Sequence, residues 1–241
     1  MMGLTLSRRA RLGLLLCFLI GLVLFLPLRI AAGMMGLDGQ GVSARSIDGS
    51  LWYGRITQLA VGDVSLGTVN AGLSPFPLLL GRARLDIWRK AGAPDDIAGA
   101  LTYGIGGRFG VDDVTGTASL GALFAPLPVG TVDFTDVSAY FTGGVCGDAE
   151  GRVRASIAGE IPGVNLSQGL SGDVRCEGRM LLVPLVSQSG METLNLRIGA
   201  DGRYSADMRV RSSDSALAQG LGAAGFTQAG DGFVLKVDGA L

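Results

Sequence analysis

The sequence predicts a mainly β protein, with one N-terminal transmembrane helix followed by a curved, twisted antiparallel sheet and one or two short helices. Three observations predict this fold class. An uncharged apolar run occupies residues 12–28. Apolar and polar residues alternate in several later segments, as they do in strands with one buried face. Glycine accounts for 40 of the 241 residues, well above the usual share of ~7%, and suits the turns and bends of an open barrel or a groove.

The transmembrane helix is expected over residues 12–30. Its apolar run extends from Leu12 to Leu28 and holds about 17 uncharged residues, close to the ~20 that a helix needs to cross a hydrocarbon core of ~30 Å. A cleaved signal peptide is the alternative, because the small residues at 31–33 could form a cleavage site. The apolar region of a signal peptide is typically ~7–15 residues long, shorter than the run in this chain, and Arg29 stands just before the small residues. An uncleaved anchor is therefore favoured.

Positive charge sets the expected topology. Arg8, Arg9 and Arg11 precede the apolar run, and basic residues beside a span stay in the cytoplasm. Residues 1–11 are therefore expected in the cytoplasm, and residues 34–241 are expected to form an exported β domain.

Cysteine usage agrees with an exported domain. Cys146 and Cys176 form an even pair in a compartment where disulfides persist, and a bridge between them is predicted. Two unpaired thiols are the alternative. Cys17 lies within the apolar run and has no expected partner.

Strands are predicted wherever apolar and polar residues alternate. One-sided burial of this kind favours antiparallel pairing, because parallel sheets are covered on both faces. The clearest alternation is in 153–157, 194–198, 204–210 and 233–238. Further strands are expected around 42–47, 51–60, 63–73, 82–89, 97–103, 107–119, 131–140 and 178–186.

Turns and loops separate these segments. Asp48-Gly49, Asp201-Gly202 and Asp231-Gly232 are short-turn signals, since both residue types tolerate a positive φ. Asp201-Gly202 joins two alternating segments and predicts a hairpin. The proline-containing stretches 93–96 and 125–130 are expected to be loops.

Two short helices are expected. Residues 214–224 combine a capping Asp or Ser, helix formers and a closing Gly225. Residues 74–81 predict a brief turn of helix, because proline is accepted in a first helical turn.

Composition excludes several classes of function. The chain contains no His, which removes the commonest general base and the commonest metal ligand. Two exported cysteines without histidine cannot supply the four ligands of a zinc site. A formal net charge of −1 does not suit a nucleic-acid binder. We therefore predict no enzymatic activity, no metal, no cofactor and no nucleic-acid partner.

The acidic pairs and a partial nucleophile motif are the nearest approaches to a catalytic site. Asp95-Asp96 and Asp112-Asp113 could serve as acid and base, but adjacent strand residues point to opposite faces, so solvated charge is the favoured interpretation. Leu170-Ser171-Gly172 resembles part of a nucleophile elbow, but Asp173 occupies the last glycine position.

Two further patterns have a structural and a functional interpretation. The glycine-rich stretch 104–110 lacks the Lys and Ser or Thr of a phosphate loop, and a glycine-bent strand is favoured. A row of arginines could bind acidic partners or lipid headgroups, although alternate strand positions facing water give the same row. The arginines are Arg152, Arg154, Arg197, Arg209 and Arg211.

Several short segments follow one another in a distinctive order, and no single motif among them is diagnostic. The segments are 49–54, 66–70, 73–75 with 79–82, 181–190, 201–204 and 223–226, together with Cys146 and Cys176. Their distinctive residues are Gly49, Leu51, Trp52, Gly54, Pro75, Gly81, Arg82, Pro184, Gly190, Gly225 and Phe226. The order and spacing of these segments resemble the type II secretion system protein N family of Gram-negative bacteria, and the similarity covers nearly the whole chain.

The resemblance implies a non-enzymatic accessory or assembly component of type II secretion. It implies a single-pass protein of the inner membrane, with its N-terminus in the cytoplasm and its β domain in the periplasm, and other secretion components as partners. The family also looks like AsmA-type periplasmic proteins, whose curved sheets form a groove for lipid. A lipid-binding or hydrophobe-binding groove is therefore the alternative function.

Overall fold

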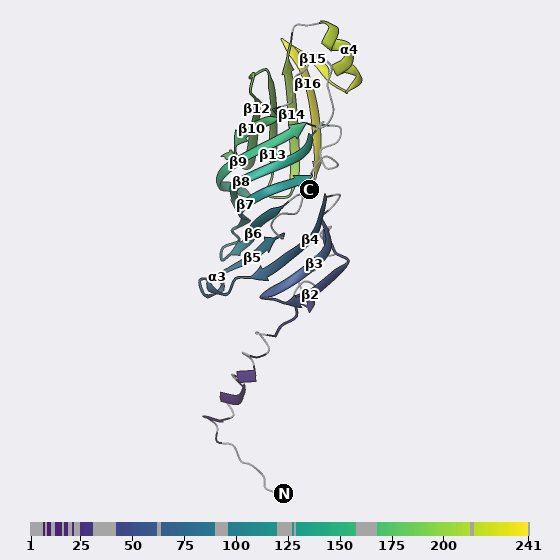
Figure 1. The fold of residues 1–241 in the computed structure, drawn as a ribbon. Helices are drawn as coiled ribbons and strands as arrows, with labels where there is room; N and C mark the ends of the chain where they lie inside the picture. The colour runs from purple at the N-terminus through teal and green to yellow at the C-terminus, as the bar shows by residue number, and fades with distance from the viewer. Residues whose placement is uncertain are drawn as a thin grey trace.

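The described residues form one 16-stranded antiparallel sheet (Figure 1). A computed structural model describes residues 42–61, 64–89, 96–119, 127, 129–157, 168–212 and 215–240, and in the N-terminal part residues 7, 9, 10, 13–15, 17, 18, 21 and 25–30. The strands lie in the order β1-β3-β4-β5-β6-β7-β8-β9-β10-β12-β13-β14-β16-β15, with β2 on β3 and β11 on β12. The mainly β prediction is confirmed, and the sheet is open because this path ends at two different strands.

The first half of the sheet comprises β1 (Val42–Ser43), β2 (Ser46–Ser50), β3 (Tyr53–Val61), β4 (Val64–Leu73), β5 (Arg82–Trp88), β6 (Ile97–Gly104) and β7 (Phe109–Ser119), with helix α3 (Pro75–Leu79) between β4 and β5. The second half comprises β8 (Val129–Thr142), β9 (Val145–Ile157), β10 (Leu170–Asp173), β11 (Arg175–Glu177), β12 (Met180–Ser187), β13 (Glu192–Ile198), β14 (Arg203–Arg211), β15 (Thr227–Ala229) and β16 (Gly232–Ala240). Helix α4 (Ser215–Ala223) stands between β14 and β15. We call these parts the N-terminal half and the C-terminal half of the sheet.

Each predicted strand overlaps a strand of the structure, and the differences lie at turns and in three short strands that the sequence does not predict, β10, β11 and β15. Asp48-Gly49 was expected to be a turn, but both residues lie in β2 and the chain turns at Leu51 and Trp52. Gly49 has φ +94, and a side chain there would meet the carbonyl oxygen of Tyr53 at 2.6 Å. Glycine is therefore needed for the close approach of two strands, and the turn prediction was wrong.

The stretches 104–110 and 125–130 also differ from prediction. Residues 105–108 form the turn between β6 and β7, with positive φ at Gly106 and Gly107, so a hairpin replaces the expected bent strand. Within the expected loop 125–130, Val129 already begins β8. The turn at 200–202, between β13 and β14, confirms the hairpin predicted at Asp201-Gly202.

A proline in β12 explains a break that the alternation pattern did not predict. Pro184 pairs with Asn195 of β13 and has no N–H to offer on its other side. The pairing of β10 with β12 accordingly stops at Ser171 and Val186, and resumes in β11 at Arg175. At the break, the N–H of Val174 donates instead to the carbonyl of Gly151 at 3.0 Å.

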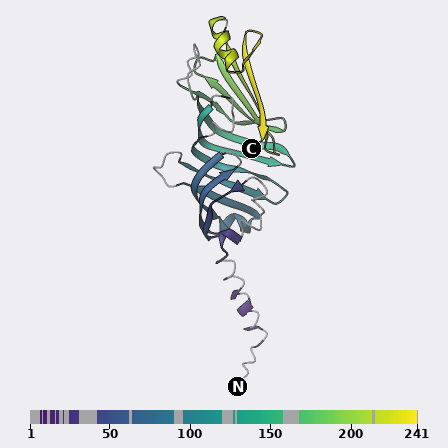
Figure 2. The ribbon, with the colours of Figure 1, turned by 90° about the vertical axis from the view of Figure 1, so that its right-hand side faces the viewer.

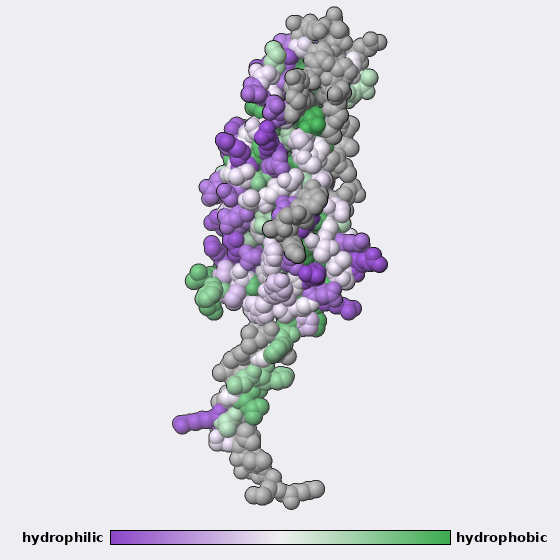
Figure 3. Space-filling view, viewed as in Figure 1, coloured by the Kyte–Doolittle hydropathy of each residue, from purple (hydrophilic) through white to green (hydrophobic). Residues whose placement is uncertain are grey.

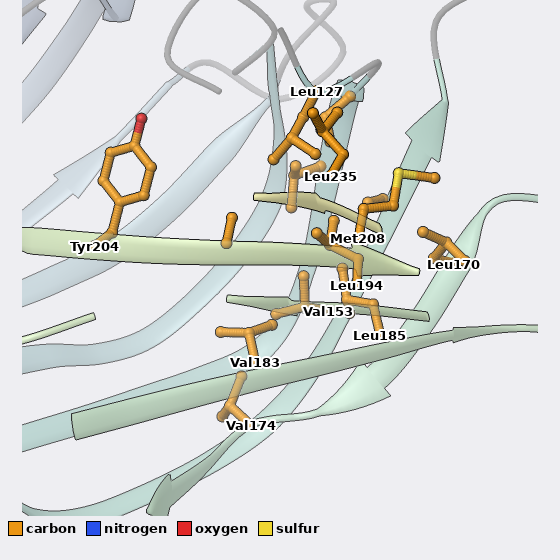
Figure 4. Close-up of a cluster of buried hydrophobic side chains, with 14 of the residues drawn as sticks. Leu127, Val153, Leu170, Val174, Val183, Leu185, Leu194, Tyr204, Met208 and Leu235 are labelled. Atoms are coloured by element: carbon orange, nitrogen blue, oxygen red, sulfur yellow. The ribbon is translucent and has the colours of Figure 1, made fainter. Parts of the chain in front are cut away.

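The core lies on one face of the C-terminal half. Every member of the main buried cluster lies at or after Leu127. Side chains from separate strands converge there, including Leu170, Leu185, Leu194 and Met208 (Figure 4). Because these strands curl toward one another, the sheet covers its own apolar face without a second sheet.

A disulfide fastens this half. Cys146 of β9 is bonded to Cys176 of β11, 30 residues later, and the predicted bridge is present. It joins the start of β9 to β11, the short strand in which pairing with β12 resumes after the break opposite Pro184. In terms of loop-closure entropy, such a bridge stabilises by roughly 3–4 kcal/mol.

The two helices appear where the sequence predicts them. Helix α4 ends at Ala223, and Gly225, two residues later, has φ +89. The N–H of Phe226 donates to the carbonyl of Leu221 at 3.0 Å. Leu221 and Phe226 are both buried in the core cluster. Helix α3 follows Ser74 and buries none of its residues.

The N-terminal segment is attached to the sheet beside β2. The N–H of Leu51 donates to the carbonyl of Leu26 at 2.8 Å, and Pro27 forms a β-bridge with Ser50. The side chain of Leu28 is buried and occupies the space that a Cβ on Gly54 would need. Two perpendicular views show this segment at one end of the sheet and α4 at the other (Figures 1 and 2).

Among the described residues, no helix combines the length and apolar character that a membrane crossing requires. The predicted span at 12–30 falls partly outside them, since residues 12, 16, 19, 20 and 22–24 are not described. Arg8, Arg11 and Leu12 lie outside the described residues, whereas Arg9 and Leu28 lie within them. The span, the cytoplasmic residues 1–11 and the exported domain 34–241 therefore remain predictions.

Candidate functional site

A polar cluster lies on the outer face of the N-terminal half, centred on Arg84 of β5. The guanidinium contacts Asp86 at 2.8 Å and Asp113 at 3.3 Å, and it also pairs with Asp112. Ser74 donates a hydrogen bond to Asp86. The carboxylates of the cluster together raise the pKa of Arg84, and the hydrogen bond that Arg84 donates to Asp86 is the largest cause. One arginine thus joins β5 to β7 across β6.

Tyr140 extends the cluster to β8. Its hydroxyl donates to Asp112, and the guanidinium carbon of Arg108 lies 4.2 Å from the centre of its ring. Burial, followed by the hydrogen bond to Asp112, raises the pKa of Tyr140 to about 12. The tyrosine therefore stays protonated at physiological pH and acts as a hydrogen-bond donor.

The paired aspartates differ from the expectation for a regular strand. Asp112 and Asp113 were expected to point to opposite faces, but both carboxylates reach Arg84. Asp113 has φ +52, and the pairing of β7 with β8 shifts register between Val111 and Val114. This bulge breaks the alternation of side chains, so the prediction of opposite faces was wrong for this pair. The prediction of solvated charge holds for the side chain of Asp113, which is 69% exposed, but not for that of Asp112, which is 19% exposed.

The contacts of the cluster link β5, β7 and β8 to one another. The cavity beside Arg84, Arg108 and Tyr140 has a volume of about 30 Å³, which is room for one or two water molecules. Within the described residues, no group of three or more His, Cys, Asp or Glu could hold a metal ion. Neither Arg84 nor Tyr140 is predicted as a site residue from the sequence, although Arg84 and Asp86 stand two apart on one predicted strand and so share a face.

Of the remaining catalytic candidates, the structure describes Asp96 and Ser171. Asp95 lies outside the described residues, and the carbonyl of Asp96 accepts a hydrogen bond from the N–H of Thr117 at 2.7 Å. Ser171 lies inside β10, paired with Arg154 and Val186, and so is not at the strand-to-helix turn of a nucleophile elbow.

The row of arginines is interleaved with acids. Arg152 pairs with Asp173 at 2.8 Å, and this hydrogen bond lowers the pKa of Asp173. Arg197 bridges Glu177 at 3.0 Å and Asp207 at 3.1 Å.

The other arginines of the row have different surroundings. Arg154 donates to the carbonyl of Gln168. Arg209 and Arg211 border a hollow of about 640 Å³ beside β15 and β16. The arginines therefore do not form a continuous basic strip.

An apolar face continues from the core into the N-terminal half. Cross-strand neighbours run from Ala139 of the core cluster through Val111 and Leu101 to Leu85. A parallel row runs from Phe141 through Phe109 and Tyr103 to Ala83. We call this the inner face. The side chain of Leu101 is 49% exposed and that of Tyr103 is 62% exposed, so the inner face is open here and closed in the C-terminal half.

The second surface of interest is the free side of β16. The short strand β15 pairs only with residues 232–234 of β16, and Thr227 donates to the carbonyl of Val234 at 3.2 Å. Because backbone groups alternate sides along a strand, those of Lys236 and Asp238 face the same side, beyond the end of β15. Within the described residues, no strand pairs with 235–240 on this side.

The motif residues fall at two ends of the molecule. Gly49, Leu51, Trp52, Gly54, Pro75, Gly81 and Arg82 lie around the β2–β3 turn and α3, where the N-terminal segment is attached. Pro184 makes the break in β12, Gly190 lies in the turn before β13, and Gly225 and Phe226 follow α4. The structure thus gives each a place in the fold and does not bring the two groups together.

Comparison with known proteins identifies relatives of the sheet. The sequence model of the family described as "Type II secretion system (T2SS), protein N" matches residues 40–236. The chain is 27% identical over 201 residues to the type II secretion system protein N of Vibrio cholerae serotype O1, covering 76% of this chain and 77% of that protein. No solved structure matches the chain.

Proposed function

We propose, from the premise that the chain belongs to the type II secretion system protein N family, that it is a non-enzymatic accessory component of type II secretion. The segment 12–30 holds it in the inner membrane, and the sheet lies in the periplasm, where it binds other secretion components. The observation that carries this proposal is the extent of the family match, which spans the sheet from residue 40 to residue 236.

The free side of β16 is the surface that suits a protein partner. Its backbone donors and acceptors at Lys236 and Asp238 offer a ready ladder to an incoming strand, and added strands gain affinity from such main-chain hydrogen bonds. Charged side chains at these positions discourage unspecific pairing between sheets. Recognition by strand addition therefore requires a partner whose own strand complements these charges.

Deletion of the gene tests the function. We expect folded exoproteins to accumulate in the periplasm and to decrease in the medium, and the full chain supplied in trans should restore their release. Normal release in the deletion strain under all growth conditions would contradict the proposal. Outer-membrane integrity is measured in parallel, so that leakage is not mistaken for secretion.

A pair of variants tests the free side of β16. Lys236→Pro with Asp238→Pro removes two outward N–H donors without removing those that face β14. Lys236→Ala with Asp238→Ala removes the same charges and keeps the donors. We expect loss of release with the proline pair and near-normal release with the alanine pair. Equal release by both pairs would show that the partner does not bind by strand addition.

A groove for lipid is a second candidate, favoured by the open inner face at Leu101 and Tyr103. Exposed apolar surface of this kind marks binding sites for apolar ligands. A photo-crosslinking residue at 101 in the full chain should capture acyl lipid in cells, whereas one at Thr102, on the opposite face of β6, should not. Equal capture at both positions would reject the groove.

A further inference from the structure

A second apolar surface lies outside both of these candidates, at α3. Phe76, Leu79 and Leu80 are 79%, 83% and 77% exposed, and Ile105 in the β6–β7 turn is 84% exposed. Ile105 packs against Gly81, and its N–H donates to the Gly81 carbonyl at 3.2 Å, so the helix and the turn form one surface. In Figure 3 this apolar protrusion stands out at the place of α3 beside a polar surface. We call it the α3 surface.

Backbone hydrogen bonds tie the α3 surface to the end of the predicted membrane span. The carbonyl of Leu26 accepts from Leu51, and the carbonyl of Leu51 accepts from Leu73 at 2.9 Å. Ser74 follows and donates to the carbonyl of Arg84, and α3 begins at Pro75. Two steps of strand spacing, roughly 10 Å, therefore separate the segment at Leu26 from the entry to α3.

This attachment leaves no linker between span and sheet. Pro27 is bridged to Ser50 and Leu28 is buried on Gly54, although both residues belong to the predicted span at 12–30. If the span crosses the bilayer, this end of the sheet must lie at the bilayer surface. Helix α3 lies at that same end (Figure 1).

The composition of the surface matches the boundary between acyl chains and headgroups. Apolar side chains that project from a short helix enter the acyl region, while neighbouring cations remain at headgroup level. Arg82 and Arg108 are both exposed and flank the apolar residues, Arg82 after α3 in sequence and Arg108 across the β6–β7 turn. Arg29, at the end of the predicted span, is exposed as well. Anionic lipid phosphates are the complementary charges.

We propose that the α3 surface is a membrane-contact site, which inserts Phe76, Leu79, Leu80 and Ile105 into the outer boundary of the bilayer that the span crosses. The inference rests on the proposed topology and goes beyond it. A single span leaves a domain free to rotate about the span axis. A second contact fixes the sheet, and so fixes the direction in which its inner face and the free side of β16 point.

Depth-dependent fluorescence quenching tests the proposal in the full chain. The protein is placed in nanodiscs of phosphatidylethanolamine and phosphatidylglycerol, with Cys17→Ser as background and the Cys146–Cys176 disulfide intact. An environment-sensitive fluorophore is attached at Leu79→Cys or at Met191→Cys, a control position that is also exposed but lies in the β12–β13 turn. At position 79 we expect blue-shifted emission that is quenched by nitroxide lipids labelled near the headgroup. At position 191 we expect water-like emission that these lipids do not quench.

A third sample separates failure of this inference from failure of the topology. The same fluorophore on native Cys17 reports the span through quenching by nitroxides deep in the bilayer. Quenching at Cys17 with water-like emission at 79 overturns the α3 surface and leaves the topology standing. Absence of quenching at Cys17 overturns both. Blue-shifted emission at 79 without lipid quenching shows burial against protein and overturns the membrane contact.

A variant provides a second measurement. Replacing Phe76, Leu79 and Leu80 together by Ser should reduce lipid quenching of a probe at Ile105→Cys several-fold. Val186→Ser with Met191→Ser is the matched control, since both residues are exposed apolar side chains of the C-terminal half, and it should leave quenching unchanged. All five residues are exposed, so formation of the disulfide should be normal in both variants. Unchanged quenching in the triple variant would overturn the proposal.

Discussion

The two halves of the sheet bury their apolar faces to different extents. In the C-terminal half, all the residues of the main buried cluster gather on one face. In the N-terminal half, the buried apolar residues of the sheet are few and mostly small: Leu59, Val69, Ala71, Ala100 and Ala118. The larger side chains of the same half, such as Leu101 and Tyr103, remain about half exposed or more.

The difference follows from curvature and from what covers each half. The C-terminal half curls until its strands face one another, and Leu221 of α4 and Phe226 are buried in its core. The N-terminal half stays open, and a polar cluster around Arg84 joins its strands on the outer face. A sheet with one apolar face needs a second layer. The C-terminal half provides its own, whereas the N-terminal half leaves apolar side chains such as Leu101 and Tyr103 exposed.

The largest expected effect is the loss of a core side chain. Met208→Ala removes a side chain that is 0% exposed and should destabilise the C-terminal half by about 2–5 kcal/mol. Leu101→Ala, on the open inner face, should cost much less. Hydrogen exchange of the full chain in detergent, read separately for each half, measures both. Equal losses would mean that the inner face of the N-terminal half is covered.

The disulfide should matter next, and only for one half. Cys146→Ser with Cys176→Ser releases a loop of 30 residues and should destabilise by roughly 3–4 kcal/mol. Protection against hydrogen exchange should fall in β8–β12 and persist in β3–β5. The control is Cys17→Ser, which leaves the bridge intact. Uniform loss across the sheet would show that the two halves unfold as one unit.

Removal of Arg84 should weaken the other half. Arg84→Gln leaves Asp86, Asp112 and Asp113 without their shared cation and should cost about 2 kcal/mol, seen as faster exchange in β5–β7. Arg203→Gln is the control, because this arginine is 83% exposed and lies 3.7 Å from its acid. If the C-terminal half responded as strongly as β5–β7, the cluster would not be local to the N-terminal half.

The smallest effect is a dependence of stability on alkaline pH, at the junction of the halves. Burial, followed by the hydrogen bond to Asp112, raises the pKa of Tyr140 from 10.0 to about 12. A group whose pKa is higher in the folded state stabilises that state fully at pH values below its unfolded-state pKa. This stabilisation is lost as the pH rises through the folded-state pKa. Stability should therefore decline between pH 10 and pH 12. Tyr140→Phe should decline less over that window, as measured by denaturant unfolding at several pH values.

Much of the fold could be predicted from the sequence, because strand alternation and turn residues are local signals. The segments 153–157, 194–198, 204–210 and 233–238 all lie in strands. The strands that were missed are β10, β11 and β15, each of four residues or fewer. Runs this short carry too few alternations to be recognised. Their positions depend on neighbours such as Pro184 and β16.

The polar cluster shows where local reasoning failed. Adjacent strand residues usually face opposite sides of a sheet, which predicts that Asp112 and Asp113 lie apart. A bulge in β7 instead brings both carboxylates to Arg84. The bulge is set by the pairing of β7 with β8, and its cation comes from β5, 28 residues earlier than Asp112. No signal within β7 alone reveals such a partner.

The sequence by itself determined a mainly antiparallel β protein, two short helices and the pairing of Cys146 with Cys176, because periodicity, capping and residue type can be recognised without the fold. The tertiary structure decided which half of the sheet closes on itself and which stays open. It also decided that α3, Ile105 and the end of the N-terminal segment meet at one end of the molecule. These outcomes depend on strand register and curvature summed over many strands, which no local pattern records.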